Sequence, residues 1–342
     1  MTTAVTAPAP WITSSQQCSL ETCPLTYAHT FYLPNTGGNA FYIALFGLFI
    51  PVQLFLGIRH RTWGFLVGLM CGLILEVLGY VARLKMRDNP FIDRWFVMYL
   101  VCLTIAPAFF SGAIYVSLAR IVAVYSLQLS RLRQRTYSLL FIAFDILSLL
   151  LQAAGGAITT SDSMSTVQTG INIMIAGLAS QVASLTLYLT LCIDFGWRVY
   201  YNIFRMSHKP EEKTSQNTTT LLTDTNTDAP GSDARLVLNP KLAALRSTKR
   251  WSTFLLLQGL ATVCIYIRCV FRVAELRGGF NSGLAQNQTT FMLLEGTMIS
   301  IAVIALSTWG HPGIGFKGHW GDLDYNMFGR RKLGGRGGEG RQ

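Results

Sequence analysis

Seven blocks of apolar residues interrupt the 342-residue chain, each close to the ~20 residues that a helix needs to cross a bilayer. In hydrocarbon every backbone polar group needs a partner within its own segment, so each block is expected to form a helix and not a strand. Only 13% of the residues are charged, against about 25% in soluble domains. The blocks are Asn39–Ile58, Gly64–Leu84, Phe96–Tyr125, Tyr137–Ala157, Ile171–Phe195, Thr253–Val273 and Phe291–Trp309.

The Lys and Arg residues predict how the bundle is oriented. If the N-terminus is outside, nineteen of them fall in cytoplasmic segments, and only Lys85, Arg87, Arg94 and Arg277 fall in outer ones. Cytoplasmic segments carry the excess of positive charge in membrane proteins. We therefore expect an outside N-terminus and a cytoplasmic C-terminus. The net charge of +11 then belongs to a face beside anionic lipid and requires no nucleic acid.

The predicted fold is an all-α integral membrane protein, a bundle of seven transmembrane helices. We expect an extracytoplasmic segment at 1–38, a transmembrane domain at 39–313 and a basic, Gly-rich cytoplasmic tail at 314–342. Residues 206–250 are rich in Thr, Ser, Asn and Asp and are predicted to form a mobile cytoplasmic loop. The first 38 residues lack Lys and Arg, which argues against a cleaved signal peptide.

Ionisable residues nevertheless lie inside the apolar blocks, although a charge near the bilayer centre costs roughly 2.5–3.5 kcal/mol on insertion scales. In the second and sixth blocks they recur at i, i+4 and i+7, which places each set on one helix face. With the predicted orientation, three acids and three arginines fall in the outer half of the membrane. The candidate site comprises Glu76, Tyr80, Arg83, Arg268, Arg272, Glu275 and Glu295.

Two interpretations of these charges stay open at this point. They could form an internal ion-pair network that fixes how the second, sixth and seventh helices pack. They could also line a polar cavity, open toward the outer leaflet, that receives a lipid headgroup. The two interpretations are compatible.

Five other residues are candidates for structural or gating roles. Pro107 removes a helical hydrogen bond and predicts a kink, whereas Arg120 lies at a cytoplasmic helix end and is expected to anchor there. Asp145 lies near the middle of the fourth block. Gln152 and Gln181 are expected to hydrogen-bond between helices.

Cys18 and Cys23 lie in the outer segment, where an oxidising compartment would permit a local disulfide. The other cysteines are expected to pack as small apolar side chains. All five histidines fall in loops or at helix ends, so no buried zinc site is expected. The chain has no G-x-x-x-x-G-K-[ST] phosphate loop and no evident nucleophile–base pair. We expect neither an enzyme nor a cofactor.

Six motifs occur in an order that resembles the fungal RTA-like family, a seven-helix group of lipid-translocating exporters that includes aminocholesterol-resistance and sphingoid long-chain-base-resistance proteins. The resemblance covers roughly residues 40–313. The motifs are "EVLGYVAR" (76–83), "LTIAPAFFSGAIYVSLARIV" (103–122), "FIAFDILSLLLQAAGG" (141–156), "GLASQ" (177–181), "IRCVFRVAEL" (267–276) and "HPG" (311–313).

The resemblance implies a fungal membrane protein with an outside N-terminus that exports amphipathic lipids or confers resistance to toxic ones. Gln288 and Glu295 depart from the pattern, since the family usually has an acid and an Asp there. The residues that match are Glu76, Gly79, Tyr80, Arg83, Pro107, Tyr115, Arg120, Asp145, Gln152, Gly156, Gln181, Arg268, Arg272 and Glu275.

With that family in view, our hypothesis is that Glu76, Glu275 and Glu295 receive the cationic amine of a sphingoid base, while Arg83, Arg268 and Arg272 keep the acids ionised. The expected partners are membrane lipids and an amphipathic substrate, in the plasma membrane. Alternatives are a lipid sensor that signals through cytoplasmic regulators bound to the 206–250 loop and the tail, a porphyrin or small-amphiphile transporter, and a purely structural membrane protein.

Overall fold

The computed structural model describes residues 18, 20, 22–25, 28, 32–125, 134–159, 163–207, 243–278, 283, 286–316 and 320. Within these residues the chain is helical and contains no β-strand. The elements are α1 (Thr36–His60), α2 (Trp63–Asp88), α3 (Asp93–Tyr125), α4 (Gln134–Ile158), α5 (Met164–Ser207), α6 (Ala243–Arg246), α7 (Lys249–Arg277), α8 (Gln288–Phe291), the π-helix η4 (Met292–Thr297), α9 (Met298–Ser307) and α10 (Pro312–Gly315).

Seven helical segments of the described residues are long and apolar enough to cross a membrane, which confirms the seven predicted spans. The seventh is composite, because α8, η4, α9 and α10 follow one another over Gln288–Gly315. The fifth was predicted too short: α5 continues past Phe195 to Ser207. The chain is therefore an integral, multi-pass membrane protein.

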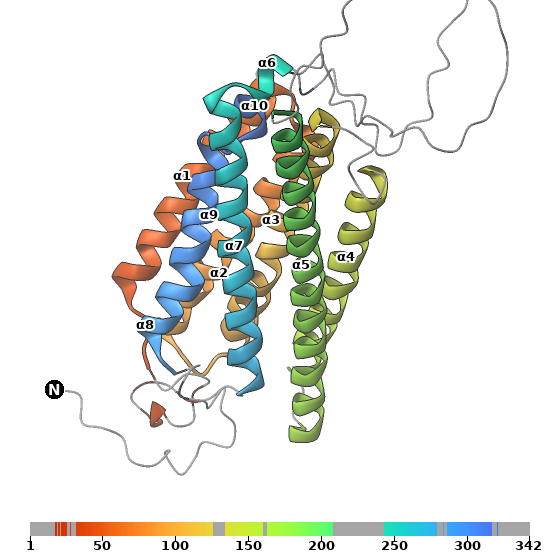
Figure 1. The fold of residues 1–342 in the computed structure, drawn as a ribbon. Helices are drawn as coiled ribbons and strands as arrows, with labels where there is room; N and C mark the ends of the chain where they lie inside the picture. Colours follow the sequence, from red (N-terminus) through yellow and green to blue (C-terminus); the bar gives the residue numbers. More distant parts are fainter. Residues whose placement is uncertain are drawn as a thin grey trace, which may run out of the picture.

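Close helix contacts are made where the sequence supplies small residues. A Cβ on Gly68 would lie 2.9 Å from the Phe109 carbonyl oxygen, and one on Gly72 would lie 2.5 Å from the Phe110 ring. This pair brings α2 against α3, as its small-xxx-small spacing predicts. Gly155 in α4 fits as tightly against Met174 in α5. Figure 1 shows α4 and α5 side by side next to α3, with α1, α2, α7 and α9 on its other side.

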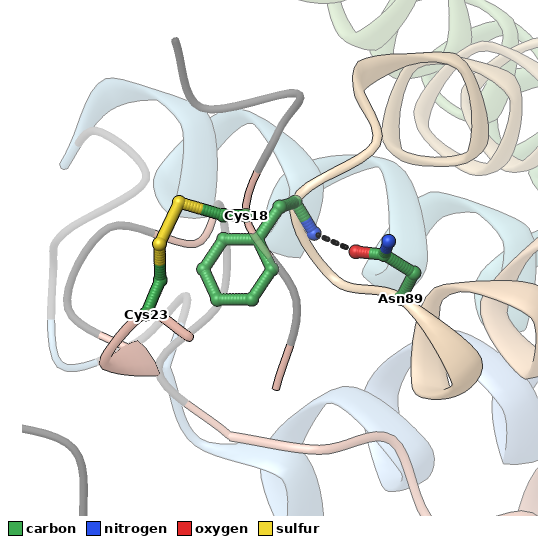
Figure 2. The surroundings of a disulfide bond; sticks show 4 residues. Cys18, Cys23 and Asn89 are labelled. Carbon is green, nitrogen blue, oxygen red and sulfur yellow. Dashed lines mark hydrogen bonds between the residues drawn. A yellow bond between two sulfur atoms is a disulfide. The ribbon is translucent and has the colours of Figure 1, made fainter. Parts of the chain in front are cut away.

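A disulfide joins Cys18 to Cys23 in the N-terminal segment, as the sequence allowed. Both cysteines are buried in one cluster with Phe91, and Phe91 lies in the turn between α2 and α3. The Phe91 amide donates to the Asn89 side-chain oxygen at 3.1 Å and fixes that turn (Figure 2). We call this end of the bundle, which also carries α8, the disulfide end. The opposite end, which carries α6 and α10, is the α10 end (Figure 1).

The predicted loop and tail are only partly described. Residues 208–242 and most of 314–342 lie outside the described residues, so regulators on those segments stay a prediction. The described ends of the loop and the tail pack on the bundle. Ala243–Arg246 is helical, and Phe316 and Trp320 are buried beside Trp251 and Phe254. Aromatic contacts between these rings hold the start of the tail against the bundle.

Candidate functional site

The six predicted charges lie on α2, α7 and η4, toward the disulfide end of the bundle. Each of these residues is at most 6% exposed, although all six are ionisable. We call this set the ionic cluster. It consists of Glu76 and Arg83 from α2, Arg268, Arg272 and Glu275 from α7, and Glu295 from η4.

Two ion pairs form within the ionic cluster. Arg268 reaches across from α7 to Glu295, with the guanidinium nitrogen 2.6 Å from the carboxylate oxygen. Arg272 pairs with Glu275 one turn further along α7, at 2.5 Å. Both pairs are buried, so losing one partner would leave an uncompensated charge. The structure thus brings together these four residues as the sequence predicted.

Arg268 also contacts the backbone of α3, and Pro107 explains why it can. A proline has no N–H, so the carbonyl four residues before it loses its helical partner. That carbonyl belongs to Leu103, and Arg268 donates to it. Thr104 next to it contacts Arg272 at 3.5 Å. The proline therefore exposes an acceptor where the cluster supplies a donor.

Glu295 lies in the π-helix η4, a local widening of the seventh span. Such irregular turns release backbone groups and are frequent at functional sites. Here the Met292 carbonyl accepts from the Tyr42 hydroxyl of α1 at 2.8 Å, and that hydroxyl also lies 3.1 Å from the Thr297 hydroxyl. A Cβ on Gly296 would overlap the Tyr42 ring. Side chains from α1 and η4 thus stabilise the backbone around Glu295.

Glu76 is fully buried and makes no ion pair or hydrogen bond with any described residue. The charges of Arg268, Arg272 and Glu295 nevertheless act on it from nearby. The second oxygen of Glu295, Oε2, likewise accepts no hydrogen bond from the described residues. Tyr80, one turn from Glu76, is buried against the rings of Tyr42 and Phe46. The ionic cluster therefore contains three buried carboxylate oxygens that accept no hydrogen bond from the part of the chain that the structure describes.

Arg83 forms no ion pair with an acid of the described residues, and its predicted role of keeping the acids ionised stays a prediction. Its guanidinium carbon lies 3.8 Å from the centre of the Phe291 ring and 5.0 Å from that of Tyr99. It also donates to the Tyr32 hydroxyl at 3.1 Å. Cation–π contacts stabilise a desolvated guanidinium without a carboxylate. The sequence analysis missed these aromatic partners because no local spacing connects them to Arg83.

The other predicted polar residues form separate interhelical contacts. Asp145 of α4 accepts from Ser111 of α3 at 2.6 Å, and Gln152 donates to Gln181 of α5 at 3.1 Å, as expected. Arg120 donates to the Trp320 carbonyl and stacks on its ring at 3.8 Å, so it contacts the start of the tail. Among the described residues, no hydrogen bond joins Asp145, Gln152 or Gln181 to the ionic cluster.

The described residues contain no group of three His, Cys, Asp or Glu side chains that could hold a metal ion. A cavity of about 430 Å³ lies between α3, α5 and α7, and the ionic cluster does not line it. The predicted polar cavity at the cluster stays a prediction. What the cluster itself offers is charge: two internal ion pairs beside an unpaired carboxylate, in surroundings of low dielectric constant where Coulomb interactions are strong.

Comparison with known proteins supports the resemblance that the motifs indicated. Residues 69–319 match the family model described as "RTA1 like protein". The chain is similar to the sphingoid long-chain base transporter RSB1 of Saccharomyces cerevisiae, at 34% identity over 293 residues, covering 84% of this chain and 74% of the relative.

Two further relatives come from the same yeast. Protein RTM1 is 30% identical over 141 residues, covering 41% of this chain and 45% of the relative. Protoporphyrin uptake protein 1 is 23% identical over 240 residues, covering 69% and 65%. No solved structure matches the chain. With the family model matching most of the bundle, this seven-helix protein belongs to the RTA1-like family.

Proposed function

We propose that this protein moves single-chain amine lipids of the sphingoid-base class across or out of the bilayer, and that the ionic cluster receives their headgroup. The named function of the yeast relative RSB1 supports the substrate class. The chemistry of the cluster supports it independently. The single observation that carries the proposal is Glu76, a fully buried carboxylate with no hydrogen-bond donor among the described residues.

An ammonium group matches the acceptors of the cluster in number and in charge. It carries three N–H donors and no acceptor. Glu76 supplies two free oxygens and Glu295 supplies one. Because Arg268 already pairs with Glu295 and Arg272 with Glu275, the charge of Glu76 is the one that an added cation would balance. Glu275 then shapes the site through Arg272 instead of contacting the amine.

The proposal includes the orientation that the Lys and Arg distribution predicts. The disulfide end then faces the outside, and the ionic cluster lies in the outer half of the plasma membrane. The lipid tail would remain among helices or in the surrounding bilayer. A proton or lipid gradient, or an acceptor on the far side, would supply the driving force.

Purified full-length protein in liposomes tests this function directly. A fluorescent sphingoid base is added to the liposomes that contain the protein, and its transfer to acceptor vesicles is measured. We expect Glu76→Gln to lower the rate by about tenfold or more, since a hydrogen bond to a charged group contributes roughly 1.5–3 kcal/mol. Asp88→Asn is the matched control, because Asp88 lies on the same helix but is exposed.

Each outcome of that assay decides something. Normal transport by correctly folded Glu76→Gln protein would refute the headgroup assignment. Wild-type protein that binds the lipid without moving it would favour the lipid sensor over the transporter.

A second candidate substrate is a porphyrin, which the similarity to protoporphyrin uptake protein 1 favours. Porphyrin carboxylates would contact the arginines of the cluster, so transport of this class should survive Glu76→Gln. Measuring protoporphyrin transport with the same liposomes, with and without Glu76→Gln, compares the two substrate classes.

A further inference from the structure

The cavity between α3, α5 and α7 lies in the other half of the bundle and is mostly apolar. Its volume is about 430 Å³, inside the range of roughly 300–1,000 Å³ for small-molecule sites. We call it the side slot. Its walls include Ile114, Leu118 and Ile121 of α3 and Phe195 and Val199 of α5.

The side slot is long and narrow. On α3 its lining runs from Ile114 to Tyr125, and on α5 from Tyr188 to Tyr200. At 1.5 Å per residue these stretches measure about 17 Å and about 18 Å. Thr262, the slot residue of α7 nearest to the ionic cluster, lies six residues before Arg268, so the slot ends about 9 Å from the cluster along that helix. It is therefore a separate site toward the α10 end.

Two glycines open the side slot to the surface of the bundle. Gly196 of α5 and Gly259 of α7 both line it, and both are exposed. A Cβ on either residue would meet no atom within 4 Å. Glycine within a helix costs about 1 kcal/mol relative to alanine. Here the two glycines leave a lateral opening, which larger side chains at these positions would fill.

One polar group in the wall has an unmet hydrogen-bonding capacity. Gln258 is 5% exposed and lines the slot. Its amide nitrogen donates to the Gly310 carbonyl at 3.0 Å, which fixes the orientation of the amide. Its amide oxygen accepts no hydrogen bond from any described residue. A buried acceptor without a donor is costly, so this oxygen points to a ligand that carries a hydroxyl or ammonium group.

We propose that the side slot binds the alkyl chain of a single-chain lipid, with a hydroxyl or ammonium of that lipid donating to Gln258. The inference rests on the proposed function for its lipid class and adds a second binding site, in the half of the membrane opposite to the ionic cluster. The lateral opening lies between two helices that are long and apolar enough to span a membrane, so we expect lipid chains beside it. An alkyl chain that enters the slot makes dispersion contacts with the apolar walls, and these contacts are absent when the slot is empty.

Full-length protein in liposomes with a photoactivatable, clickable sphingoid base tests the site. Light attaches the probe to whatever it contacts, and mass spectrometry locates it. We expect labels on 114–125, 188–200 and 255–262. Gly259→Leu and Gly196→Leu fill the slot and should lower labelling of these peptides by about tenfold. Gly47→Leu in α1 is the matched control, since a Cβ there also meets no atom within 4 Å but Gly47 does not line the slot.

Competition separates a specific site from ordinary contact with bilayer lipid. Excess unlabelled sphingoid base should displace the probe from these peptides, whereas an alkane of equal chain length should not. Labels that are spread over all lipid-facing helices, or that persist unchanged in Gly259→Leu, would overturn the inference.

The two proposals can fail separately. Glu76→Gln should lower the rate of transport by about tenfold or more while slot labelling continues. If the wild-type protein is labelled in the slot but does not transport the lipid, the proposed function alone is refuted. If the wild-type protein transports the lipid but is not labelled in the slot, this inference alone is refuted.

Discussion

At the scale of single residues, the protein keeps six ionisable side chains out of water by giving them different partners. Four of the charges compensate one another within two ion pairs, Arg268–Glu295 and Arg272–Glu275. Arg83 contacts aromatic rings and a phenol, whereas Glu76 accepts no hydrogen bond from the described residues and is acted on by the charges of nearby members of the cluster. A purely structural network would have no evident use for the unpaired acid, and this asymmetry favours a binding role.

The Arg268–Glu295 pair predicts a strong coupling between two helices. Arg268→Met would leave Glu295 buried and unpaired, a change that costs roughly 3–5 kcal/mol. The double variant Arg268→Met/Glu295→Met removes both charges and should be more stable than Arg268→Met alone. Unfolding in mixed detergent micelles measures the free energies of the cycle. Strictly additive effects would contradict the pairing.

Asp194 and Arg198 form the control pair on α5. They lie 3.0 Å apart with side chains 34% and 40% exposed. Partly exposed pairs usually contribute up to about 1 kcal/mol, so the same cycle should give a much smaller coupling. This comparison isolates burial as the source of the difference.

At the scale of helices, two interruptions of regular hydrogen bonding meet at Arg268. Pro107 frees the Leu103 carbonyl in α3, and the π-helix η4 positions Glu295 in the seventh span. One guanidinium therefore ties both irregular backbones together. Prolines and π-turns are usual causes of helix kinks, and π-turns are frequent at functional sites.

Pro107→Ala tests the link between the proline and the cluster. The new N–H at residue 107 would give the Leu103 carbonyl a helical partner and compete with Arg268 for it. We expect equal or higher thermal stability in detergent and several-fold slower sphingoid-base transport. Pro51→Ala is the control, because Pro51 is exposed in α1. Unchanged transport in Pro107→Ala would mean that the Arg268–Leu103 contact has no part in function.

The sequence predicted the helices better than their contacts, for a physical reason. Hydropathy reports the solvent of each segment, so seven spans and the buried charges could be found from composition and spacing. Which arginine meets which acid depends on the rotation and depth of each helix. The stacking of Arg83 on Phe291 therefore could not be predicted, and the side slot around Gly196 and Gly259 was missed because an opening has no local signature.

At the scale of the whole molecule, the two ends of the bundle are chemically distinct. The disulfide end carries the Cys18–Cys23 bond, and the N-terminal segment is bound there through Tyr32 on Arg83 and the Pro34 carbonyl on Arg87. The α10 end carries a buried aromatic group around Trp251. A disulfide is stable in an oxidising compartment, which agrees with the outside N-terminus that the Lys and Arg residues predict.

That orientation can be tested with single cysteines at the two ends. Asp88 at the disulfide end is exposed, and so is Ser247 at the α10 end. We expect a membrane-impermeant maleimide to label Asp88→Cys in intact spheroplasts, and Ser247→Cys only after permeabilisation. The native cysteines provide an internal background, because Cys18 and Cys23 are bonded and the others lie within the spans. The reverse labelling pattern would place the ionic cluster in the cytoplasmic half, and sphingoid bases would then meet Glu76 before they reach the side slot.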